Sequence, residues 1–144
     1  MKNHKLMVDA GFLFALLSKS DLHHLSAQKI KNQMRERQWV STWPVITEVV
    51  HLLIKREHGK TVDTFMEFCK KGGIEIFQLN LSHLPKLQGY MKKYQDLPMD
   101  LADASLVILA DELQISDIVS TDIRDFQTYR WMSHKPFRNL LSTI

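Results

Sequence analysis

The chain has 144 residues, of which 44% are hydrophobic and 24% are charged, and its formal net charge is +3. This balance is typical of an ordinary globular protein, and the length suits one domain spanning residues 1–144. No apolar run reaches the roughly 18–20 residues that span a bilayer, so we expect no membrane partner. The mildly basic charge is compatible with a nucleic-acid partner but does not by itself indicate one.

The N-terminal region shares one feature with a secretory signal, because basic residues precede an apolar stretch from Leu6 to Leu17. However, Asp9 lies inside that stretch, and no A-x-A-like cleavage site follows it. Cys69 is the single cysteine, which rules out an internal disulfide and fits a reducing compartment. We therefore expect a cytoplasmic protein.

Hydrophobic periodicity and boundary residues predict strands and helices that alternate along the chain. Predicted strands cover residues 5–9, 38–42, 74–79 and 117–120, with an edge strand at 137–141. Predicted helices cover residues 10–17, a segment ending near Arg37, and residues 44–58, 61–71, 82–94 and 98–113. Pro44 suits the first turn of its helix, where the N–H that proline lacks has no helical partner. The alternation predicts an α/β fold with a mainly parallel sheet.

Acidic residues follow two of the predicted strands. Asp9 ends the first strand, and Asp122 follows the strand at 117–120. Parallel sheets place their functional sites beyond the carboxyl ends of the strands, so these two carboxylates are candidates for a site. Taken separately, each of them fits better as a helix cap or a turn residue than as part of a site.

Two further acids interrupt apolar helix faces. Glu48 has the neighbours Val45, Val49 and Leu52, whereas Asp103 has the neighbours Met99, Leu106, Val107 and Ala110. A buried carboxylate is costly unless it is paired, protonated or bound to a metal ion. Each of these acids alone could have a basic partner or a backbone donor, but the pair makes a common site the better interpretation.

Four carboxylates at one sheet edge would repel one another, and a divalent cation relieves that repulsion. Ligands that are all oxygen suit Mg²⁺ or Mn²⁺ rather than zinc, and the histidines and Cys69 lack the spacing of a zinc site. Such an acidic site suits phosphodiester hydrolysis. Basic residues that could hold a nucleic-acid backbone are Lys31, Arg35, Arg37, Lys55, Arg56, Arg124 and Arg130.

The chain resembles PIN-domain proteins, and specifically the VapC-type toxins of bacterial toxin–antitoxin pairs. The segments that carry the resemblance are Met7-Val8-Asp9, Thr47-Glu48-Val49, Leu101-Ala102-Asp103-Ala104-Ser105 and Ser120-Thr121-Asp122-Ile123-Arg124-Asp125-Phe126. They occur in the order of the family and span nearly the whole domain.

The resemblance implies a three-layer α/β/α PIN fold with a mainly parallel central sheet and a ribonuclease site that depends on Mg²⁺ or Mn²⁺. It assigns Asp9, Glu48, Asp103 and Asp122 as the catalytic, metal-binding quartet, and Thr121 as a supporting hydroxyl. It also implies a homodimer and inhibition by a small co-encoded antitoxin protein. The apolar residues near the N-terminal helices that would serve these partners are Phe12, Phe14, Leu22 and Leu25.

The sequence departs from the family pattern at two points. Ala10 follows the first acid, where the family often has Ser or Thr. Asp100 is an additional acid three residues before Asp103, so the two would share one side of a helix, and the apolar neighbours favour Asp103 as the ligand. Asp125 is interpreted as a turn residue.

Two other functions remain open at this point. A non-catalytic PIN-like module that binds nucleic acid or protein is the main alternative, although the intact quartet argues against it. A metal-dependent phosphatase would need a nucleophilic Asp in a D-x-D arrangement, which Asp9-Ala10-Gly11 does not supply.

Overall fold

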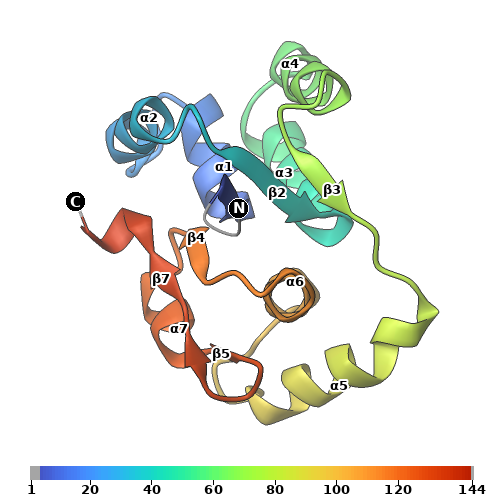
Figure 1. The fold of residues 1–144 in the computed structure, drawn as a ribbon. Coiled ribbons are helices and arrows are strands. Elements are labelled where there is room, and N and C mark those ends of the chain that lie inside the picture. Colours follow the sequence, from blue (N-terminus) through green and yellow to red (C-terminus); the bar gives the residue numbers. More distant parts are fainter. Residues whose placement is uncertain (1–3, 144) are drawn as a thin grey trace.

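The computed structural model describes residues 4–143, and five parallel strands form its central sheet (Figure 1). The strand order is β3 (Glu75–Phe77), β2 (Gln38–Thr42), β1 (Lys5–Val8), β4 (Asp117–Val119) and β7 (Arg138–Asn139). In the register of the central strands, Met7 lies opposite Val40 on one side and Ile118 on the other. The parallel α/β sheet predicted from the sequence is therefore confirmed.

Helices cover both faces of the sheet, as the alternating order of elements requires. Figure 1 shows α1 (Ala10–Leu17), α2 (His24–Gln33) and α4 (Gly59–Lys70) on one face, and α5 (Leu84–Lys93) and α6 (Leu101–Leu113) on the other. The helix α3 (Trp43–Arg56) packs against both α1 and α4, and its first turn approaches α6. The arrangement is the predicted three-layer α/β/α architecture.

The segment after β4 contains elements that periodicity did not predict. The short helix α7 covers Ile123–Thr128, and a hairpin follows it, formed by β5 (Arg130–Trp131) and β6 (Lys135–Pro136). The tip of the hairpin contains two consecutive left-handed residues, Met132 and Ser133, with φ of 45° and 67°. Neither residue type signals such a turn, and six helical residues are too few to show a repeat.

Several boundaries differ from the predicted ones. The helix α6 begins at Leu101 rather than 98, because the Asp100 side chain caps it by accepting the Asp103 N–H at 2.8 Å. The helix α5 begins at Leu84, after the 3₁₀ turn η2 (Leu81–His83), and a second 3₁₀ segment, η3 (Leu140–Thr143), follows β7. Asp100 therefore stands at the start of α6 and not on its side face as the sequence predicted.

The core corrects one expectation about partner surfaces. Phe12 and Phe14 belong to the buried core, with 0% and 4% exposure, so they are not available for a partner. Leu22 and Leu25, by contrast, are 91% and 83% exposed. Within residues 4–143, no helix is both long enough and apolar enough to cross a membrane.

Candidate functional site

The carboxyl ends of β1 and β4 bring Asp9 and Asp122 to the same edge of the sheet. Asp9 caps α1, because its Oδ1 accepts the Phe12 N–H at 2.9 Å. The Ser120 hydroxyl donates to Asp9 Oδ2 and accepts the Asp122 N–H at 2.9 Å. One buried serine therefore links the two strand-end acids.

Ser120 is itself held by the last strand of the sheet. The side chain of Asn139 accepts the Ser120 N–H at 3.1 Å and donates to the Ser120 carbonyl at 2.9 Å. The same amide oxygen accepts the Leu141 N–H at 3.2 Å. Asn139 is buried, so these bonds are shielded from water and fix the backbone from which Ser120 reaches Asp9.

The first turn of α6 carries Asp103 to this edge. The Tyr129 hydroxyl donates to Asp103 Oδ2 at 2.9 Å. A buried contact between Thr42 Oγ1 and Ser105 Oγ at 2.6 Å ties the start of α3 to the same turn of α6. This contact joins α6 to α3, the helix that carries Glu48, in the same region of the molecule.

Three aspartates lie close enough to share one cation. Asp103, Asp122 and Asp125 each offer a carboxylate oxygen, and these oxygens all lie within 4.8 Å of one another. Asp125 belongs to the first turn of α7. Its interpretation as a turn residue is therefore wrong, since it faces two members of the predicted quartet from a helix.

The pKa values show how the remaining acids interact with this group. The pKa of Asp9 is raised from 3.8 to about 7, first by burial and in smaller part by the charges of Asp122 and Glu48, which together outweigh the lowering effect of its hydrogen bonds to Ser120 and Phe12. Burial, followed by the charge of Asp100, raises the pKa of Asp103 to about 8. Burial is also the largest cause of the raised pKa values of Glu48 and Asp122.

These carboxylates form no salt bridge with any residue that the structure describes. Across residues 4–143, none of the salt bridges involves Asp9, Glu48, Asp103, Asp122, Asp100 or Asp125. The alternative in which Glu48 and Asp103 each have a basic partner or a backbone donor is therefore wrong for the described residues, and burial of ionised carboxylates without such partners is unfavourable. The donor set is all oxygen and fits the hard divalent cations Mg²⁺ and Mn²⁺.

Two hydroxyls follow β4 at this edge: that of Thr121, which the sequence predicts as a supporting group, and that of Ser120, which it does not. The Thr121 hydroxyl lies against Gly11, where an added Cβ would approach Thr121 Oγ1 to 1.9 Å. It is Ser120 that bonds to Asp9. Strand register provides the missing signal: Val8 lies opposite Val119, so the next residues along, Asp9 and Ser120, meet.

Most of the basic residues suggested for nucleic-acid binding lie elsewhere or are engaged in the fold. Arg37 bonds to Asp117 and to the Lys5 carbonyl at the amino edge of the sheet, so it cannot serve the acidic edge. Arg130 caps the end of α7 by bonding to the Gln127 and Tyr129 carbonyls. Arg124, exposed in the first turn of α7, remains beside the acids.

Comparison with known proteins agrees with this geometry. The sequence pattern of the PIN domain family matches residues 6–131 of the chain. Among solved structures, the fold is similar to that of VapC20 from Mycobacterium tuberculosis, described as a toxin that cleaves the sarcin-ricin loop, with a TM-score of 0.75 and 13% sequence identity. The similarity covers 83% of this chain and 93% of VapC20, whereas no curated protein matches by sequence. Because the matched residues include the whole acidic edge, the chain belongs to the PIN-domain family.

Proposed function

We propose that this protein is an endoribonuclease that uses Mg²⁺ or Mn²⁺ to hydrolyse phosphodiester bonds in RNA, and that it is the toxin of a toxin–antitoxin pair. The observation that carries the proposal is the group Asp103, Asp122 and Asp125, which interacts with the charges of Asp9 and Glu48 and forms no salt bridge within residues 4–143. Membership of the PIN family and the fold of an RNA-cleaving toxin support RNA as the substrate class.

The chain's own residues have distinct roles in this proposal. Asp9, Asp103, Asp122 and Asp125 would hold the cation, and Ser120 keeps the Asp9 carboxylate oriented. A bound divalent cation supplies an activated water and neutralises charge on the phosphate. Glu48 receives no hydrogen bond from the described residues, so its carboxylate is available to take a proton at the edge of the site.

The metal requirement provides the first test. Purified protein is expected to cleave labelled RNA with Mg²⁺ or Mn²⁺, and excess chelator is expected to abolish the cleavage, because the clustered carboxylates form no salt bridge with a described residue and would need the cation to activate water and to neutralise the phosphate. The measurement is the rate of product formation on a gel. An Asp122→Asn protein purified in parallel controls for contaminating nucleases.

Three results would contradict this assignment. Cleavage that persists in chelator, or that requires zinc, would exclude the acidic edge as the active site. Binding of RNA without cleavage in the presence of either metal would instead identify a non-catalytic PIN-like module.

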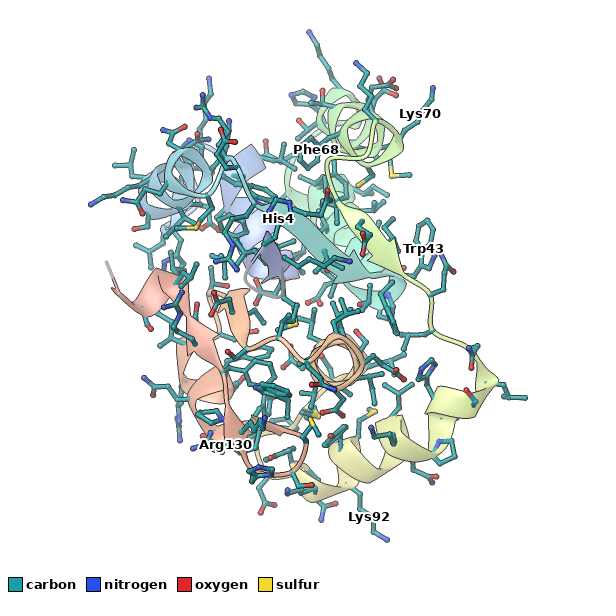
Figure 2. The ribbon with its side chains drawn as sticks, in the orientation of Figure 1. His4, Trp43, Phe68, Lys70, Lys92 and Arg130 are labelled. Atoms are coloured by element: carbon teal, nitrogen blue, oxygen red, sulfur yellow. The ribbon has the colours of Figure 1, made fainter. Side chains whose placement is uncertain are left out.

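The partners form a second part of the proposal. A groove between α1, α2 and α4 is lined by Leu13, Leu16, Trp39 and Phe68, with Lys31 beside it. Figure 2 shows Phe68 on α4 beside this region. An apolar groove with a basic rim suits an antitoxin segment that carries apolar and acidic residues. We further propose a homodimer that acts in the cytoplasm, where RNA is present.

Expression in a bacterial host tests the toxin assignment. Expression of the intact protein is expected to arrest growth, and co-expression of a small protein encoded next to it is expected to restore growth. The purified protein is expected to have the molar mass of a dimer when measured by light scattering. The Asp122→Asn variant is the control, since it keeps the surface and removes one acid. A harmless, monomeric wild-type protein would argue against the toxin role.

A further inference from the structure

Tyr129 lies directly behind the acidic edge, at the end of α7. Tyr129 is fully buried. Its ring makes edge-to-face contacts with the rings of Tyr94 and Phe126, at centroid distances of 5.1 Å and 5.0 Å. The Tyr94 hydroxyl accepts the N–H of Arg130 at 3.1 Å, which fixes the chain immediately after Tyr129. The ring therefore has little freedom, and its hydroxyl is held in one direction.

That hydroxyl engages only one oxygen of the nearby carboxylate. It donates to Asp103 Oδ2 at 2.9 Å, whereas no described residue donates to Asp103 Oδ1. A carboxylate oxygen that accepts a strong hydrogen bond is a poorer metal ligand than its free partner oxygen, because one lone pair is already used. Asp103 thus has one oxygen held by Tyr129 and one oxygen free of hydrogen bonds from the described residues, and its carboxylate lies in the group with Asp122 and Asp125.

The number of oxygens that a carboxylate offers affects which cation a site prefers. Mg²⁺ needs near-octahedral ligands at roughly 2.0–2.1 Å, whereas Ca²⁺ takes about six to eight oxygens and readily uses both oxygens of a carboxylate. We propose that Tyr129 is a positioning residue that makes Asp103 a one-oxygen ligand, and that the site therefore favours Mg²⁺ or Mn²⁺ over Ca²⁺. This inference rests on the proposed metal-dependent function.

The variant Tyr129→Phe tests this role, because it removes the hydroxyl and keeps the ring that packs on Tyr94 and Phe126. The matched control is Tyr90→Phe, which also removes a hydroxyl that donates to an aspartate, here Asp111 at 2.5 Å. Neither Tyr90 nor Asp111 belongs to the acidic group. Calorimetric titration of each protein with Mn²⁺ and with Ca²⁺ gives the two dissociation constants, and a melt in chelator reports the fold.

Loss of the Tyr129 hydroxyl is expected to weaken Mn²⁺ binding by about tenfold. This is the lower end of the range of about 10–100-fold that is typical when a hydrogen bond to a metal ligand is lost. Binding of Ca²⁺ should stay constant or tighten, since Asp103 can then offer both oxygens. The ratio of the two constants therefore changes in Tyr129→Phe and stays at the wild-type value in Tyr90→Phe.

An unchanged ratio in Tyr129→Phe, even with both affinities reduced, would overturn the positioning role and leave only a structural one. The proposed nuclease function fails separately: wild-type protein that binds Mn²⁺ but does not cleave RNA contradicts that function, while a changed ratio still supports the role of Tyr129. Wild-type protein that binds neither cation overturns both proposals.

Discussion

Asp103→Asn is expected to lower the rate of RNA cleavage by at least about a hundredfold, since loss of a second-sphere partner alone costs about 10–100-fold and a ligand should cost more. Asp100→Asn is expected to retain a measurable fraction of activity. Asp103 contributes an oxygen to the group that includes Asp122 and Asp125. Asp100 is exposed, and its carboxylate caps α6, a role that asparagine fills equally well.

Initial rates on one labelled RNA at saturating Mn²⁺ provide the measurement for both variants. Asp125→Asn should resemble Asp103→Asn in weakening Mn²⁺ binding, because its carboxylate lies within the same 4.8 Å group. Higher activity in Asp103→Asn than in Asp100→Asn would mean that Asp100, and not Asp103, is the metal ligand. Wild-type activity in Asp125→Asn would mean that α7 supplies no metal ligand through Asp125.

Asp9→Asn is expected to abolish catalysis and yet leave the metal-free protein as stable as wild type, or more stable, at about pH 8.5. Burial raises the pKa of Asp9 to about 7 in the folded state, well above its unfolded value near 3.8. The proton on Asp9 therefore stabilises the fold fully below pH 3.8, and this contribution is lost as the pH rises through about 7.

The substitution separates charge from shape. Asparagine keeps an oxygen that can accept the Phe12 N–H, so the cap of α1 survives while the buried negative charge is removed. In chelator, the wild-type melting temperature should fall between about pH 5 and pH 8.5. The fall in Asp9→Asn should be smaller by a few °C. Added Mn²⁺ should raise the melting temperature of wild type more than that of Asp9→Asn, because binding to the folded state stabilises it by mass action.

Asp21→Asn is the matched control, because Asp21 also caps a local turn, through the His23 N–H at 2.9 Å, but lies outside the acidic group. Its melting temperature should show the wild-type dependence on pH. If Asp9→Asn melted far below wild type in chelator and both gained equally from Mn²⁺, Asp9 would be a structural cap and the metal site would have to be abandoned.

The sequence was sufficient to predict the layers of the fold and the edge at which the acids meet. Strand ends identify Asp9 and Asp122, and interrupted apolar helix faces identify Glu48 and Asp103, because both signals depend on local patterns. The structure brings all four into one electrostatic group, although their catalytic roles stay a prediction.

The residues that the sequence did not predict depend on relationships that are not local. Ser120 meets Asp9 only through the register of β1 and β4. Tyr129 reaches Asp103 because α7 ends where its ring can pack on Tyr94. Asp125 joins the acids because α7 begins at once after Asp122, and this helix is too short to produce a visible repeat.

The dependence of Ser120 on Asn139 has a consequence for protein synthesis. Asn139 follows Ser120 by 19 residues, and it supplies the bonds that fix Ser120 behind Asp9. A ribosome therefore completes all the acids well before it completes the strand that orders their edge. A nascent chain would therefore gain the ordered edge that joins Asp9 to Asp122 only after β7 has left the exit tunnel and paired with β4.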